Sequence, residues 1–183
     1  ACHGSKAQWF LDRGARVVCV EPQPENVEIL RNKFQNNGNV VVVPAGAGTT
    51  PGQLELKYST DIEWMSSFSE KWRSEARFKA ANWNRQVMVD IITLDQLVAN
   101  YGHPVYTKID VEGYEPEVIG GLSQKAGMIS FEFSREIISN AAAAIARLSE
   151  IGYGEFNYSL GENDHWSLAQ WLPAGEILDS LSG

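Results

Sequence analysis

The chain has 183 residues, and 15 lysines and arginines against 23 aspartates and glutamates leave a net charge of −8. The length and a hydrophobic fraction of 44% predict a single globular domain spanning residues 1–183. The acidic balance argues against nucleic acid as a partner, because phosphate binding needs clustered basic residues. With no apolar run long enough to span a membrane and no signal-peptide pattern, we expect a cytoplasmic protein without a membrane partner.

Short apolar runs alternate with helix-like segments along most of the chain. Ser5 with Gln8, and Thr93 with Gln96, have the spacing of a helix capping box. The β-branched run 16–20 is typical of a strand buried on both faces. In chain order, the predicted elements are a helix at 5–13, a strand at 16–20, a helix at 24–36, strands at 40–43 and 53–58, a helix at 70–81, a strand at 85–92, a helix at 94–101, a strand at 105–110, a helix at 116–122, a strand at 128–133, a helix at 139–151 and strands at 153–160 and 166–171.

Alternating strands and helices predict an α/β fold with a Rossmann-like, mostly parallel sheet and helices on both faces. The last two strands are joined by a short turn, so they must form an antiparallel pair at the C-terminal edge. Residues 61–84 show no clear period and read as an insertion. Its large apolar side chains suit a substrate cover, core packing or the interface of a homodimer, and they are Trp64, Met65, Phe68, Trp72, Phe78 and Trp83.

In sheets of this class, ligands bind beyond the carboxyl ends of the strands. Gly4 and Ser5 form a turn into a helix N-terminus, where the backbone can approach a carboxylate and the helix dipole favours it. Glu21 directly follows the strand 16–20 and precedes Pro22, at close to the spacing at which an acidic residue accepts ribose hydroxyls. A solvated loop carboxylate is the alternative for Glu21.

Two further strand ends carry candidate site residues. Ala45, Gly46 and Ala47 follow the strand 40–43, and their small side chains leave room for a flat ring such as adenine, although a tight turn would look the same. Asp110 ends the strand 105–110, and Glu112 follows it before a glycine. Two carboxylates so close together repel each other, and a cationic ligand would relieve that cost, whereas capping of the next helix is the alternative.

Three segments of the chain, taken together, resemble a known family. Residues 17–24 (VVCVEPQP), 92–95 (ITLD) and 108–113 (KIDVEG) look like FkbM-type methyltransferases. Such enzymes use S-adenosylmethionine, have the class I methyltransferase fold and mostly methylate oxygens of sugars, polyketides and other natural products. The family pattern begins with a strand ending in Asp-x-Gly, of which residues 1–4 match only the tail, with Cys2 in place of the usual asparagine. We therefore expect the first strand to be missing from this sequence.

The resemblance implies a role for each strand end. It places Gly4 and Ser5 near the methionine part of the cofactor, Glu21 on the ribose and Asp110 near the methionine amino group or the reacting centre. The predicted cofactor-binding residues are Cys2, Gly4, Ser5, Glu21, Pro22, Ala45, Gly46, Ala47 and Asp110.

The resulting prediction is an O-methyltransferase acting on a hydroxyl of a small molecule, sugar or natural product. Asp110, Glu112 and His3 are the candidate catalytic residues, each able to act as the base. No metal constellation is expected. The alternatives are methylation of nitrogen, a non-catalytic methyltransferase-like binding module and, disfavoured by the lone glycine of the first turn, a nicotinamide oxidoreductase.

Overall fold

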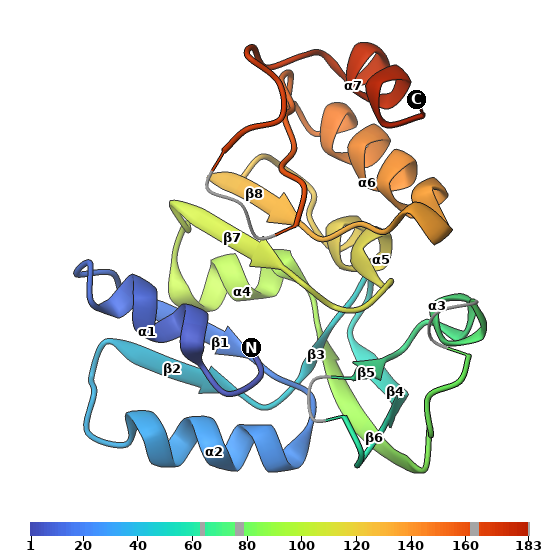
Figure 1. Ribbon diagram of the computed structural model, residues 1–183. Helices are drawn as coiled ribbons and strands as arrows, with labels where there is room; N and C mark the ends of the chain where they lie inside the picture. Colours follow the sequence, from blue (N-terminus) through green and yellow to red (C-terminus); the bar gives the residue numbers. More distant parts are fainter. Residues whose placement is uncertain (63–64, 76–78, 162–164, 183) are drawn as a thin grey trace.

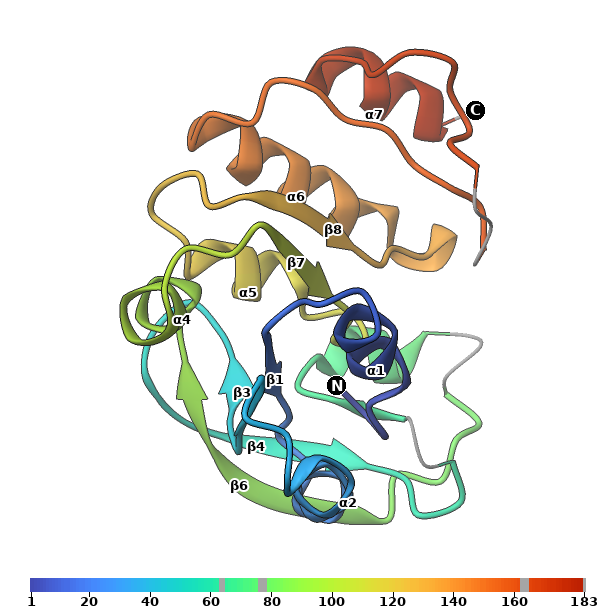
Figure 2. The same ribbon diagram turned by 90° about the vertical axis from the view of Figure 1, so that its left-hand side faces the viewer.

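The computed structural model describes residues 1–62, 65–75, 79–161 and 165–182. Three small β-sheets with helices packed beside them form a mixed α/β fold (Figures 1 and 2). None of the helices in these residues has the length and apolar character that crossing a membrane would require.

The first sheet is a parallel pair flanked by two helices. Val17 pairs with Val40 and Val20 with Val43. Side chains of both helices and both strands form a small core around Leu30, which is fully buried. The structure confirms the two predicted strands and the second helix, which begins at Pro24 as expected. The elements are α1 (Ser5–Leu11), β1 (Val17–Val20), α2 (Pro24–Phe34) and β2 (Val40–Val43).

Two local predictions for this part of the chain are wrong. The N-cap of α1 is Gly4, with φ 75° and no side-chain cap, so Ser5 and Gln8 form no capping box. Strand β1 is not buried on both faces, because only Cys19 is buried and Val18 is 40% exposed. Residues of both α1 and α2 pack with Cys19, whereas Val18, on the opposite face of β1, is not part of this core.

The second sheet has the strand order β3-β6-β4-β5. β4 and β6 pair antiparallel along their length, from Gly52 opposite Ile91 to Tyr58 opposite Arg85, and β3 pairs parallel to β6. The predicted strands 53–58 and 85–92 are confirmed, whereas β3 and β5 are two-residue strands that hydrophobic alternation could not reveal. The strands are β3 (Gly46–Ala47), β4 (Gly52–Tyr58), β5 (Ser66–Ser67) and β6 (Arg85–Ile92).

The predicted helix 70–81 is shorter in the structure. α3 (Glu70–Ser74) is preceded by its N-cap Ser69, whose hydroxyl accepts a hydrogen bond from the N–H of Trp72. The helix ends before Glu75, which takes an extended conformation. The rest of the predicted helix includes residues 76–78, which lie outside the described residues. Trp64 and Phe78 of the predicted insertion lie outside them as well.

The third sheet pairs β7 with β8 in parallel, with Tyr106 opposite Met128 and Ile109 opposite Phe131. The largest core of the protein lies between this sheet and its helices and includes the fully buried Ile119. The predicted capping box of Thr93 and Gln96 is confirmed at the start of α4. The elements are α4 (Leu94–Tyr101), β7 (Tyr106–Ile109), α5 (Glu115–Gly120), β8 (Met128–Phe131), the 3₁₀ turn η1 (Arg135–Ile137), α6 (Ile138–Glu150) and α7 (Ala174–Ser182).

The predicted antiparallel strand pair at the C-terminal edge is present only in part. In the described residues the pairing is reduced to an isolated bridge between Phe156 and Leu172, with a further hydrogen bond from Ser167 N to Tyr158 O at 2.7 Å. The turn expected at 161–164 falls mostly on residues outside the described part. A helix that was not predicted, α7, follows and packs on α6 (Figure 1).

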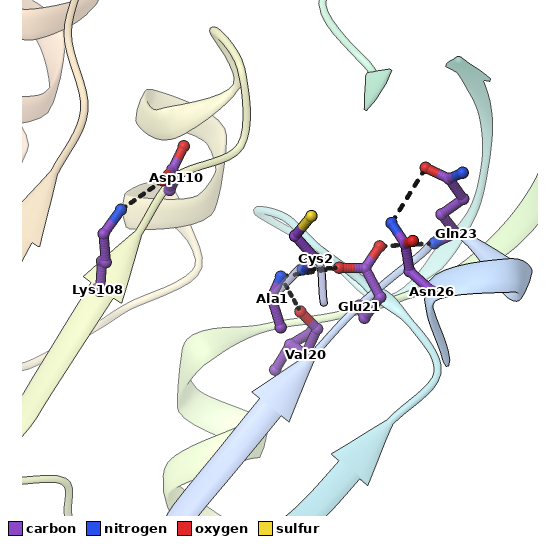
Figure 3. A network of polar contacts seen from close by, with 8 residues as sticks. All are labelled: Ala1, Cys2, Val20, Glu21, Gln23, Asn26, Lys108 and Asp110. Atoms are coloured by element: carbon purple, nitrogen blue, oxygen red, sulfur yellow. Dashed lines mark hydrogen bonds and ion pairs between the residues drawn. The ribbon is translucent and has the colours of Figure 1, made fainter. Parts of the chain in front are cut away.

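The described residues thus form three sheets in place of the single predicted one. In Figure 1 the arrows of β1, β2, β7 and β8 nevertheless point the same way. β1 leads into Glu21 and β7 into Asp110, so the two polar strand ends identified from the sequence lie at carboxyl ends of similarly directed strands (Figure 3).

Candidate functional site

Glu21, at the end of β1, is a buried carboxylate that binds the backbone. Its Oε2 accepts a hydrogen bond from the backbone N–H of Cys2 at 2.7 Å and forms an ion pair with the ammonium of Ala1 at 2.8 Å, and its Oε1 accepts a hydrogen bond from the backbone N–H of Gln23 at 3.1 Å (Figure 3). The residue is only 3% exposed. Both oxygens are therefore engaged by the protein, and Oε1, which accepts one hydrogen bond, has a second lone pair that could accept a ribose hydroxyl. Contact with ribose stays a prediction, and the solvated-loop alternative does not fit this burial.

The turn that Glu21 holds has an unusual backbone. Cys2 has φ 47°, in the left-handed region that side chains disfavour, and its N–H is fixed by Glu21. His3 lies in the same turn, and its carbonyl accepts Lys33 Nζ at 3.1 Å. The structure thus brings Cys2, His3 and Glu21 together at one end of β1, with the half-buried Pro22 following.

The packing of α1 explains why residue 4 is a glycine. Its φ is 75°, and a Cβ at this position would lie 2.8 Å from side-chain atoms of Leu30 and Phe34. Only glycine lets α1 approach α2 this closely. Ser5 is the exposed first residue of α1, and the contact of Gly4 and Ser5 with a cofactor stays a prediction.

Ala45, Gly46 and Ala47 do not border an open space in this structure. Gly46 and Ala47 form β3, and a Cβ on Gly46 would lie 2.6 Å from Phe68 Cζ and 2.8 Å from Ile91 Cδ1. The Phe68 ring also lies 5.4 Å from that of Tyr114. Small residues at this strand end therefore admit the protein's own aromatic side chain. An adenine ring would require Phe68 to move.

At the end of β7, Asp110 and Glu112 lie on a tight turn. Lys108 forms an ion pair with Asp110 (Figure 3). Partial burial raises the pKa of Asp110, but the hydrogen bond and charge of Lys108 outweigh it and hold that pKa below its ordinary value. Glu112 has φ 54° and is half-buried. Asp110 is thus held ionised at the exposed strand end.

Sequence reasoning missed a third carboxylate at this end of the sheet. Glu132 follows β8 directly, as Asp110 follows β7, and Ile109 pairs with Phe131. Carboxylate oxygens of Asp110, Glu112 and Glu132 all lie within 4.8 Å of one another. The signal was present, because Glu132 lies near the end of the predicted strand 128–133, but only the register of β8 beside β7 reveals the contact. We call Asp110, Glu112 and Glu132 the acidic group.

Two carboxylates of the acidic group, those of Asp110 and Glu132, lie close enough to shift each other's pKa values. Burial first, and then the charge of Asp110 and the hydrogen bond with it, raise the pKa of Glu132 to about 7. The pair can therefore share a proton near neutral pH, with Asp110 charged and Glu132 neutral. Three carboxylates at this spacing are able to hold a cationic group or ion.

The large apolar residues of the predicted insertion mostly pack inside the protein. Met65 and Trp72 are 5% and 3% exposed and form a small cluster with Ile137. The Trp83 ring packs on that of Trp72 at 5.8 Å. Of the three uses considered for these residues, core packing is the one observed for Met65 and Trp72.

A protein-family model described as "Methyltransferase FkbM domain" matches residues 1–157. This range covers most of the chain and contains Glu21 and the whole acidic group. Searches of curated proteins and of solved structures gave no match. The chain therefore belongs to the FkbM methyltransferase family, which confirms the resemblance found in its sequence motifs.

Proposed function

We propose, from membership of the FkbM methyltransferase family, that this protein transfers a methyl group from S-adenosylmethionine to a hydroxyl of a small molecule, sugar or natural product. The observation that carries the proposal is the family match over residues 1–157. The acidic group at the ends of β7 and β8 supports it, because the cofactor carries two positive charges, on the sulfonium and on the amino group. A cationic ligand stabilises carboxylates that are crowded together.

We further propose that the β1–β2 and β7–β8 pairs are parts of a Rossmann-like sheet of the class I methyltransferase type. Both pairs are parallel, and their strands point the same way (Figure 1). Their polar carboxyl ends would then line one edge, where such sheets bind ligands. A crystal structure of the protein with S-adenosylhomocysteine tests this, and two pairs running in different directions would refute it.

The residues have distinct proposed roles in binding. Asp110 would face the methionine amino group, and Glu21 would accept ribose hydroxyls. The Gly4–Ser5 turn would face the methionine carboxylate at the start of α1. The remaining cofactor contacts would come from Cys2, Pro22, Ala45, Gly46 and Ala47.

S-adenosylmethionine supplies an electrophilic methyl group on a positively charged sulfur. The acceptor oxygen forms a bond to the methyl carbon, the carbon–sulfur bond breaks, and its electron pair neutralises the sulfur. Positioning the acceptor oxygen in line with that bond supplies much of the acceleration. The hydroxyl proton passes to a carboxylate of the acidic group or to His3. Glu112 is the half-buried candidate and Asp110 the exposed one.

Calorimetry with S-adenosylhomocysteine tests the proposal directly. We expect binding to the wild-type protein, and no heat of binding at millimolar ligand would refute it. Glu21→Gln should weaken that binding about tenfold or more, because the amide offers one fewer acceptor oxygen for the ribose. Glu28→Gln, an exposed position on the neighbouring helix, is the matched control and should leave the affinity unchanged. Equal affinities for both variants would remove Glu21 from the cofactor site.

A specific observation favours one alternative, the non-catalytic binding module. Gly46 is covered by Phe68, so one predicted cofactor surface is filled by the protein itself. Transfer of radioactive methyl groups from S-adenosylmethionine to a panel of sugars, alcohols and amines distinguishes the two. Labelled alcohols or sugars support the O-methyltransferase, labelled amines support methylation of nitrogen, and binding without transfer to any acceptor favours the module.

A further inference from the structure

The turn that carries Glu112 is held in a conformation that its sequence disfavours. Glu112 has φ 54° and Gly113 has φ 86°, so two successive residues are left-handed. Among the non-glycine residues that the structure describes, Cys2 is the only other one with a left-handed backbone conformation. A glutamate in the left-handed region is strained, and such strain persists only where surrounding contacts enforce it.

Hydrogen bonds enforce this turn from three directions. Glu115, which is 4% exposed, accepts the N–H of Gly113 at 3.1 Å and of Val111 at 3.3 Å through one oxygen. Ser67 Oγ donates to the carbonyl of Glu112 at 2.6 Å. Asn140 Nδ2 donates to the carbonyl of Gly113 at 2.9 Å. Both carbonyls of the strained turn are thus fixed by side chains from other parts of the chain.

Trp72 closes the turn by packing on it. A Cβ on Gly113 would lie 2.5 Å from both Cβ and Cδ1 of Trp72. The tryptophan is 3% exposed and is held in its cluster with Met65 and Ile137. Gly113 is therefore required both by its backbone conformation and by this contact.

The hydroxyl of Ser67 has a fixed orientation. It accepts the N–H of Ser69 at 2.9 Å, which leaves its own proton for the carbonyl of Glu112. Its backbone is anchored as well. Ser67, in β5, pairs with Lys57 of β4, and the carbonyl of Ser67 accepts a hydrogen bond from Arg73 Nη1 at 2.9 Å. At 1% exposure, Ser67 is a rigid and buried donor.

We propose that Ser67 and Trp72 are positioning residues that hold Glu112 in its left-handed conformation and so place its carboxylate beside Asp110 and Glu132. Ser67 and Trp72, which belong to the insertion predicted at 61–84 as a possible substrate cover, would then form part of the frame of the acidic group. The link to the cofactor rests on the proposed function, whereas the link to the turn does not.

The first experiment tests the turn without any ligand. Ala and Gly at position 112 differ in their tolerance of a left-handed backbone, so Glu112→Gly should melt a few degrees above Glu112→Ala. In a Ser67→Ala background the turn is free to relax, and this difference should shrink to less than half. A difference of equal size in both backgrounds would overturn the role of Ser67. Ser66→Ala, the neighbouring change in β5, is the matched background and should preserve the full difference.

The second experiment tests the consequence for binding. Ser67→Ala should weaken the binding of S-adenosylmethionine about fivefold, as expected for a displaced charge near a solvated cation. The same substitution should weaken the binding of S-adenosylhomocysteine, which lacks the sulfonium charge, by less than twofold. A general loss of stability would lower both affinities alike, and that result, or unchanged affinities, would overturn the link to the cofactor. If the wild-type protein binds neither compound, the proposed function fails, while the melting experiment still decides the role of Ser67.

Discussion

Glu132→Gln should change how the stability of the protein depends on pH. Glu132 lies beside Asp110 because β7 and β8 pair with Ile109 opposite Phe131. Burial and the neighbouring charge raise its pKa from 4.5 to about 7. Glutamine has nearly the same shape, can donate a hydrogen bond to Asp110 as the protonated acid does, and cannot ionise.

The sign follows from proton binding. Between pH 4.5 and about 7 the folded protein holds a proton on Glu132 that the unfolded chain has lost, so the free energy of unfolding falls as pH rises through this interval. A shift of this size corresponds to at most about 3 kcal/mol. The carboxyl group of Glu132 is only partly buried and the residue as a whole is exposed, so solvent screening reduces the expected effect to about 1 kcal/mol. Asp110 has a lowered pKa, and its contribution is lost only in more acidic solution.

Urea unfolding at a series of pH values from 5 to 8 measures this effect. At pH 5 the variant and the wild-type protein should have nearly equal free energies of unfolding, and at pH 8 the variant should be more stable by about 1 kcal/mol. Glu155→Gln, at an exposed glutamate outside the acidic group, should show no such gap. A gap for Glu132→Gln that is constant from pH 5 to 8 would refute the coupling of Glu132 with Asp110.

Three further substitutions test the packing by urea unfolding. Gly113→Ala should lower the free energy of unfolding by more than about 2 kcal/mol, because it adds a clash with Trp72 to an unfavourable φ. Gly14→Ala, with φ 82° and open space around it, should cost only about 1 kcal/mol, and equal losses would contradict the clash. Thr93→Ala should cost about 1 kcal/mol through loss of the capping box, whereas Thr93→Ser should cost much less. Leu30→Ala should cost about 3 kcal/mol by opening a cavity, and a loss below about 1 kcal/mol would show that the core of α2 collapses around it.

Much of the local structure could be predicted because its cause lies within a few residues. The capping box of Thr93 and Gln96, the proline at the start of α2 and the alternation along β6 are local signals, and the structure confirms all three elements. Similar signals failed where tertiary contacts decided the outcome. The N-cap of α1 is Gly4 and not the predicted Ser5, because the packing of α1 on Leu30 and Phe34 requires a residue without a Cβ there.

The site was only half predictable for a related reason. Asp110 and Glu21 end their strands in sequence, so their placement at strand ends followed from the pattern of elements. Glu132 joins Asp110 only through the register of β7 and β8, and the left-handed turn at Glu112 depends on Ser67, which lies far away in the sequence. Sequence patterns identify which residues end a strand. They do not show which distant hydroxyl fixes the turn that follows.

The two strand ends differ in what they can offer a ligand, and this difference orients the proposed cofactor. Glu21 is buried and accepts the backbone N–H groups of Cys2 and Gln23, and its Oε1, which has a single donor, can accept a hydrogen bond from a neutral hydroxyl. The acidic group has the opposite character, because its carboxylates crowd one another and raise the pKa of Glu132. A cationic ligand lowers the free energy of these crowded carboxylates. The charged methionine end of S-adenosylmethionine is therefore expected at the ends of β7 and β8, and its uncharged ribose at the end of β1.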